Sequence, residues 1–174
     1  MPSPVGHALA GYAVGTLVAG RPGGGRRSVL DTVPGRLALF AGLACLPDID
    51  FLFRSHSMYT HSVGAVLIVA VLAALVIRSP PGLVAACAVA YGSHLLLDWL
   101  GRDTNPPLGI MALWPLSRDY YTSPVPLLEP VSRRFRLPNF WSHNLRVVGF
   151  EVLFFGAMAV AAHLWRGRTS TSQS

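Results

Sequence analysis

Five apolar stretches divide this chain, and short polar or glycine- and proline-rich segments separate them. The stretches lie at roughly 4–20, 37–53, 62–77, 83–100 and 147–165. Helices of this length measure about 24 to 29 Å, close to the roughly 30 Å hydrocarbon core of a bilayer. The pattern predicts an all-α integral membrane bundle of about five apolar helices, which stand upright or are partly sheltered by protein.

Composition favours a membrane protein over a soluble all-α protein, the other class in which apolar helices are buried. Hydrophobic residues make up 52% of the chain and charged residues only 13%, and the mean hydropathy is +0.46. Too little polar surface remains to cover a soluble globule. The sequence predicts a single membrane-embedded helical domain over 1–165, with a long interfacial loop at 101–146 and a disordered polar tail at 166–174.

The net charge of +6 comes from 14 basic residues, all of them arginine and scattered between the apolar stretches. This distribution favours contacts with lipid headgroups, so membrane lipid is the expected partner and no nucleic-acid site is expected. The arginines divide equally between the two predicted sides of the membrane. The positive-inside rule therefore does not orient the chain.

Histidine and aspartate interrupt the apolar stretches, most clearly at His94 and Asp98. An unpaired charge inside the membrane costs roughly 2.5 to 3.5 kcal/mol even on lenient insertion scales, so a compensating partner is expected. Four residues apart on a helix, the two side chains share one face, which suits two ligands of one metal ion or a structural ion pair. Asp98 either binds the metal itself or hydrogen-bonds a ligating histidine.

The remaining candidate ligands are predicted on the same side of the membrane as this pair, if all five stretches span it. Pro47 disfavours a helical conformation for the residue before it, and in an extended segment Asp48 and Asp50 present both carboxylates to one cavity. An exposed turn, or interfacial histidines, is the alternative at each position taken alone. His143 and Glu151 remain open as further ligands or a proton path. The predicted metal ligands are His7, Asp48, Asp50, His56, His61, His94 and Asp98.

Mixed imidazole and carboxylate ligands suit Zn²⁺ best, with Mn²⁺ or Fe²⁺ as alternatives. Seven ligands exceed the need of one tetrahedral ion, which leaves a multinuclear site open. Such sites activate water for hydrolysis, and Asp48 or Asp50 is the candidate general base. The arginines at 133–136 either clamp a phosphate or anchor the chain to anionic lipid. The candidate substrate-binding residues are Arg54, Arg134 and Arg136.

Six short motifs, spread over roughly 6–138, resemble those of a known membrane family. They are Gly6 His7, Leu46 Pro47 Asp48 Ile49 Asp50, Thr60 His61 Ser62, Ser93 His94 with Asp98, Leu113 Trp114 Pro115, and Arg134 Phe135 Arg136 Leu137 Pro138. In this order they are similar to the YdjM-like, LexA-regulated metal-dependent hydrolases. The resemblance implies an integral protein of the cytoplasmic (inner) membrane. Phe51 replaces a histidine of the family pattern and Ser57 an arginine, which removes a ligand and a substrate-binding cation.

The sequence thus predicts a membrane-bound metal-dependent hydrolase that acts on a lipid-associated ester through metal-activated water. The order of the histidines and aspartates is also similar to that in zinc-dependent phospholipase C and related zinc nucleases, and this distant likeness favours a phosphoester. Two alternatives remain. A metal or ion transporter places its ligands near the bilayer midplane, and a non-catalytic membrane scaffold keeps its role without them.

Overall fold

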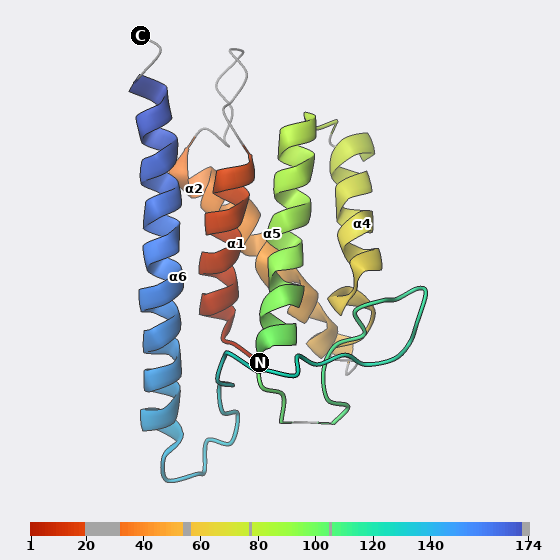
Figure 1. Cartoon of the computed structure of the whole chain (residues 1–174), viewed down its shortest axis with the longest axis vertical. Helices are drawn as coiled ribbons and strands as arrows, with labels where there is room; N and C mark the ends of the chain where they lie inside the picture. Colours follow the sequence, from red (N-terminus) through yellow and green to blue (C-terminus); the bar gives the residue numbers. More distant parts are fainter. Residues whose placement is uncertain (20–31, 54–56, 77, 105, 172–174) are drawn as a thin grey trace.

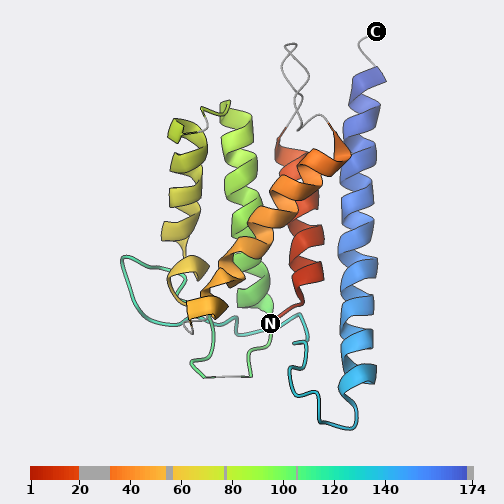
Figure 2. The same cartoon turned by 180° about the vertical axis from the view of Figure 1, so that it is seen from behind.

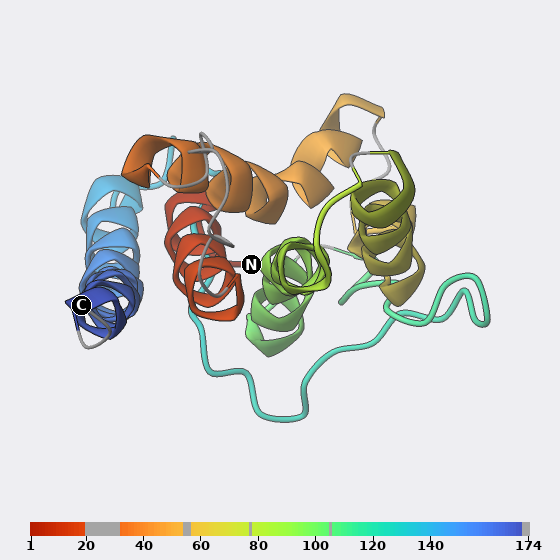
Figure 3. The same ribbon diagram turned by 90° about the horizontal axis from the view of Figure 1, so that it is seen from above.

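Four helices lie side by side in this protein, in the spatial order α6, α1, α5, α4 (Figures 1 and 3). The computed structural model describes residues 1–19, 32–53, 57–76, 78–104 and 106–171. Across this part of the chain the regular elements are helical, as the sequence predicts. The four helices are α1 (Pro4–Val18), α4 (Val63–Val71), α5 (Pro81–Leu100) and α6 (Phe140–Thr171), with a π-helical turn η5 (Leu72–Val76) continuing α4.

An irregular helical segment crosses one face of this row obliquely and ends near the start of α4 (Figure 2). Its hydrogen-bonding pattern changes repeatedly along its length. The segment comprises α2 (Val33–Arg36), the π-helix η2 (Leu37–Ala41), α3 (Gly42–Cys45) and the 3-10 helix η3 (Leu46–Phe53). A further short 3-10 helix, η4 (Tyr59–His61), precedes α4. The oblique segment thereby connects the α6 side of the row to the α4 side.

Glycines on α1 allow the oblique segment to pack closely against it. A Cβ atom on Gly15 would lie 2.5 Å from Cγ of Phe40, and one on Gly11 would meet the side chain of Ala44 and lie 2.9 Å from the Phe40 carbonyl oxygen. Phe40 is fully buried and packs in a cluster with small residues of α5 such as Ala86. The backbones therefore approach at van der Waals distance, the usual solution where small residues line a helix contact in a membrane.

Local capping explains where the helices begin. The hydroxyl of Ser3 accepts a hydrogen bond from the Gly6 amide, and Pro4 occupies the first turn of α1. Ser62 caps α4 because its hydroxyl accepts a hydrogen bond from the Ala65 amide. Both caps fix the start of a helix next to a candidate metal ligand.

The long connection between α5 and α6 closes the end of the bundle at which α1 and α4 begin (Figure 1). Its backbone bonds to α4 through the Val63 amide and the Ala112 carbonyl oxygen, 2.9 Å apart, and through the Gly64 amide and the Trp114 carbonyl oxygen, 3.1 Å apart. The amide of Arg102 bonds the Leu128 carbonyl oxygen at 2.9 Å. These bonds satisfy backbone groups in a segment without regular structure, which holds the connection against the helix ends.

The predicted five-span bundle is only partly confirmed. Among the described residues, two helices are long and apolar enough to cross a membrane, at Pro81–Leu100 and Phe140–Arg166, whereas the apolar helix at Val63–Leu75 is shorter. The predicted span at 37–53 lies within the oblique segment, where π and 3-10 turns interrupt the α-helix. The sequence also placed a disordered tail from residue 166, whereas α6 continues to Thr171.

Candidate metal centre

Histidine and aspartate side chains from four separate segments meet at the end of the bundle where α5 ends and α1 begins. His94 and Asp98 come from the last two turns of α5, and His7 comes from the first turn of α1. These three side chains are at most 2% exposed. Such burial is unusual for titratable groups and requires partners that offset the loss of hydration.

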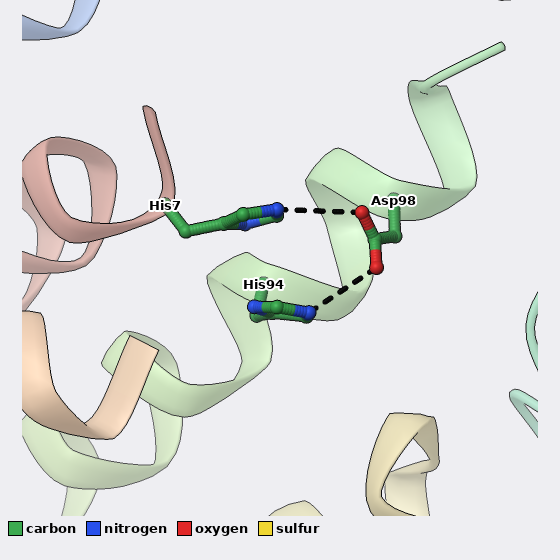
Figure 4. A group of neighbouring side chains, drawn as sticks. All are labelled: His7, His94 and Asp98. Carbon is green, nitrogen blue, oxygen red and sulfur yellow. Dashed lines mark ion pairs between the residues drawn. The ribbon is translucent and has the colours of Figure 1, made fainter. Parts of the chain in front are cut away.

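The carboxylate of Asp98 lies within ion-pair distance of two stacked imidazoles, those of His7 and His94 (Figure 4). Its Oδ1 lies 3.3 Å from Nε2 of His7, and its Oδ2 lies 3.1 Å from Nε2 of His94. The two rings stack with centroids 3.8 Å apart and planes at 20°. The spacing of four residues in α5 thus places His94 and Asp98 on one face, as predicted, and α1 adds a third group to that face.

His61, from η4, brings a third imidazole nitrogen to the same carboxylate. Its Nε2 lies 3.0 Å from Nε2 of His94 and 3.4 Å from Oδ2 of Asp98. Oδ1 of Asp48, from η3, is 3.8 Å from the Nε2 atoms of both His61 and His94. Two sets of candidate ligands result, and within each set the ligand atoms lie within 4.8 Å of one another. One set is His7, His94 and Asp98, and the other is Asp48, His61 and His94, so the two sets share His94.

The other ring nitrogens of His61 and His94 already have partners. Nδ1 of His94 lies 2.6 Å from the carbonyl oxygen of Ala44, which only accepts, so this nitrogen carries the proton. Nδ1 of His61 lies 3.1 Å from Oδ2 of Asp50, which also accepts a hydrogen bond from the Thr60 hydroxyl. In the neutral rings both Nε2 atoms therefore carry lone pairs that point toward each other. A proton or a metal ion beside the two nitrogens relieves this repulsion, and an Nδ1 that is held by a carbonyl or carboxylate is usual for histidines that bind metal.

The buried carboxylate of Asp98 supports the same conclusion. Neither of its oxygens has a partner of hydrogen-bonding geometry among the described residues, although histidine nitrogens lie 3.1 to 3.4 Å away. A buried carboxylate without hydrogen bonds is strongly unfavourable unless a positive charge lies beside it. The donor set of imidazole nitrogens and carboxylate oxygens therefore fits a divalent ion.

In the metal-free protein a proton takes the place of that positive charge. Burial lowers the pKa of His61, but the neighbouring carboxylates of Asp50 and Asp98 outweigh this effect and raise the pKa to about 9. The protonated ring then donates through both nitrogens. A metal ion that binds at Nε2 of His61 must displace this proton.

We therefore expect metal affinity to rise with pH. Below pH 9 the metal competes with the His61 proton, so apparent zinc affinity should increase about tenfold per pH unit and level off above pH 9. The folding stability of the metal-free protein should change in the opposite direction and fall as pH rises. The raised pKa of His61 gives a stabilisation that is complete below pH 6.5 and is lost as pH rises through about 9. Competition titrations with a zinc chelator, and thermal unfolding of the metal-free protein, measure the two effects. An affinity independent of pH from 6 to 8 would contradict the assignment.

Comparison with known proteins gave one result. The family described as YdjM inner membrane protein matches residues 1–169. The chain belongs to the YdjM inner membrane protein family. No curated protein matched, and no solved structure matched. The family covers every described residue of the histidine and aspartate cluster.

Membership of the YdjM family explains the apolar surface of the protein. Leu153 on α6 is 76% exposed and Leu67 on α4 is 60% exposed, in the two outer helices of the row. In an inner membrane protein such side chains face lipid, where their exposure costs nothing. The histidine and aspartate cluster lies at the end of the row where α5 ends and α1 begins.

Asp48 and Asp50 differ from the prediction in backbone and in role within this YdjM-family protein. The extended conformation predicted for them is wrong, because residues 46–53 form a 3-10 helix in which Pro47 occupies the first turn and needs no hydrogen-bond donor. The two carboxylates consequently reach His61 from different sides, Asp48 at Nε2 and Asp50 at Nδ1. Asp50 thus orients a ligand, and Asp48 lies with the ligand atoms.

Four other predicted site residues are not part of the described cluster. Arg54 and His56 lie outside the described residues. Arg134 and Arg136 are exposed, and Arg136 stacks on Phe135 with 5.5 Å between guanidinium carbon and ring centroid. The sequence did not identify Thr60 or the Ala44 carbonyl as partners of the histidines. The position of Thr60 next to His61 was the available signal for the first.

His143 and Glu151, open alternatives in the sequence, have structural roles in the YdjM-family fold. Nε2 of His143 lies 2.8 Å from the Pro130 carbonyl oxygen. Glu151 is 1% exposed and accepts hydrogen bonds from the amide and the hydroxyl of Ser3. Glu151 therefore fastens α6 to the cap of α1, the helix that carries His7.

A cavity of about 370 Å³ opens beside the cluster. Asp48 contributes the more accessible carboxylate, since its side chain is 24% exposed and that of Asp98 only 1%. The cavity is large enough for a small polar group and the solvent around it. It is lined by Met1, Pro2, Pro4, His7, Asp48, Phe51, Asp98, Val131 and Arg133.

Proposed function

We propose that this YdjM-family protein is a membrane-bound metal-dependent hydrolase whose metal is held by His7, His61, His94 and Asp98. The observation that carries the proposal is the approach of the His61 and His94 Nε2 atoms to 3.0 Å, with each Nδ1 already occupied. Imidazole and carboxylate donors favour zinc, and Mn²⁺ or Fe²⁺ are accommodated by the same set.

A bound divalent ion would supply a Lewis acid that activates water and stabilises negative charge on the reacting ester. The chain's own groups prepare this chemistry. Asp50 and the Ala44 carbonyl hold the two histidines in the tautomer that leaves Nε2 free. Asp48, 3.8 Å from both Nε2 atoms and accessible from the cavity, is the group that takes a proton from the attacking water.

We infer that the substrate is an ester associated with lipid, and most simply a phosphoester. The cavity lies at the end of apolar helices in an inner membrane protein, so a substrate anchored in the membrane reaches it without leaving the surface. Its lining combines carboxylates and histidine with an arginine and apolar side chains. Such a lining suits a polar reacting group attached to an apolar body.

Metal analysis and a hydrolysis screen of the detergent-purified wild-type protein test this proposal. We expect about one equivalent of zinc by mass spectrometry, and turnover of a phospholipid or of a model phosphodiester such as bis(p-nitrophenyl) phosphate. Chelation should abolish turnover and zinc should restore it. Absence of metal would instead support a scaffold, and metal uptake into proteoliposomes without turnover would support a transporter.

A further inference from the structure

Arg133 forms part of the wall of the cavity beside the metal centre. Its guanidinium carbon lies 4.3 Å above the ring centroid of Phe51, a cation–π contact that holds the charged group in place. Phe51 and Arg133 line the same cavity as His7, Asp48 and Asp98. The lining of the cavity therefore contains both candidate metal ligands and a positively charged group.

A second cavity, of about 220 Å³, adjoins the first and shares the wall that contains Arg133. Phe51 and Val131 line both cavities, and the second adds polar groups from Ser57, Asp103 and Thr104. Arg133 therefore lies between a space next to the metal ligands and a space lined by hydroxyl and carboxylate groups. A substrate that spans both spaces passes the guanidinium.

The charge of Arg133 is available to a ligand. Among the described residues Arg133 forms no ion pair with a carboxylate, and it is exposed. The first cavity carries two carboxylates, Asp48 and Asp98, which repel an anionic substrate. A guanidinium in the lining of the same cavity offsets this repulsion, and its planar donors match the oxygens of a phosphate. A neutral carboxylic ester would gain nothing from this charge.

We propose that Arg133 binds the non-bridging oxygens of a phosphate ester whose phosphorus lies beside the metal ligands, with the polar alcohol part in the second cavity. This assignment rests on the proposed function and names the residue that recognises the phosphate of its phosphoester substrate. Among Arg133, Arg134 and Arg136, the proposal assigns phosphate binding to Arg133. Arg134 lines a different cavity of about 250 Å³, and Arg136 stacks on Phe135.

Binding of phenylphosphonate, a phosphate mimic that does not turn over, tests the assignment by isothermal titration of zinc-loaded protein in neutral detergent. We expect Arg133→Gln to raise the Kd about tenfold or more, since a charged hydrogen-bond pair is lost. Arg133→Lys should lie between wild type and Arg133→Gln, because charge remains without the planar donors. The matched control, Arg136→Gln, should change Kd less than about twofold.

The outcomes of this titration test the Arg133 phosphate subsite separately from the proposed metal centre. Equal phosphonate binding by wild type and Arg133→Gln, with zinc content unchanged in both, would overturn the subsite and leave the proposed hydrolase standing. Equal weakening in Arg136→Gln would also overturn it, since a general charge effect would then suffice. If the wild type binds no metal, the proposed function fails, and the same titration of metal-free protein still decides whether Arg133 binds phosphonate.

A second titration series distinguishes a lipid phosphate from a water-soluble phosphate ester as the natural ligand of Arg133. The titration is repeated in micelles that contain phosphatidylglycerol. If a lipid phosphate occupies the subsite, phosphatidylglycerol should weaken phosphonate binding in wild type and have no such effect in Arg133→Gln. If the ligand is a water-soluble phosphate ester, glycerol phosphate should compete and phosphatidylglycerol should not. Competition by neither would overturn the phosphate assignment.

Discussion

His94→Ala is expected to remove stoichiometric metal from the purified protein and to weaken zinc affinity by more than about 100-fold, since loss of even an outer partner of a metal ligand costs 10- to 100-fold. His94 belongs to both candidate ligand sets, and its Nε2 is the atom closest to Nε2 of His61. Its ring is fixed by the Ala44 carbonyl and stacked on His7, so its Nε2 is held in place for a metal ion. Metal content by mass spectrometry and zinc affinity by chelator competition measure the loss.

His143→Ala is the matched control for this variant. His143 bonds the Pro130 carbonyl and lies outside both ligand sets, so its removal should leave the metal content at the wild-type value. His94→Gln preserves more of the packing and tests whether any loss reflects unfolding. Retention of one equivalent of zinc by folded His94→Ala and His94→Gln would refute the metal centre.

Asp48→Asn is expected to lower kcat by about 100- to 10,000-fold, the usual contribution of a general base, while the protein keeps its metal. The amide has the shape of the carboxylate but cannot accept the proton of water. Asp48 is the site carboxylate most accessible from the cavity, and it lies 0.7 Å farther from His94 Nε2 than Asp98 does (3.8 against 3.1 Å). Turnover of the best substrate from the hydrolysis screen, with metal content measured on the same sample, gives the answer.

Two comparisons sharpen this result. Asp50→Asn should instead weaken zinc affinity about 10- to 100-fold, because Asp50 orients His61 without reaching the cluster. Asp119→Asn, at an exposed carboxylate bonded to the Ser117 hydroxyl, should change neither property. If Asp48→Asn loses metal as His94→Ala does, Asp48 is a ligand and another group is the base.

The arrangement explains how ionisable side chains are tolerated so close to apolar helices. Isolated in lipid, each would carry a large cost. Here the groups share one enclosed point, where carboxylates, imidazoles and either a proton or a metal ion balance each other. The connection between α5 and α6 covers that end of the bundle, so the irregular backbone near the cluster is bonded to protein instead of facing lipid.

Local sequence determined the helical class, the membrane environment and one half of the metal centre. A spacing of four residues on a helix places His94 and Asp98 on one face whatever the rest of the chain does. These features depend on neighbours along the chain, so the pattern of residues was sufficient to predict them.

Tertiary contacts determined the other half of the candidate metal centre. Asp48 and Asp50 were predicted side by side on an extended backbone, but packing of the oblique segment stabilises a 3-10 helix and gives the two carboxylates different roles. The free nitrogen of His94 is set by a carbonyl 50 residues away in the chain. The cavity likewise selects Arg133 among neighbouring arginines. Each of these depends on groups that are distant in the sequence, and one-dimensional spacing carries no information about which of them meet or which atom of a ring each one contacts.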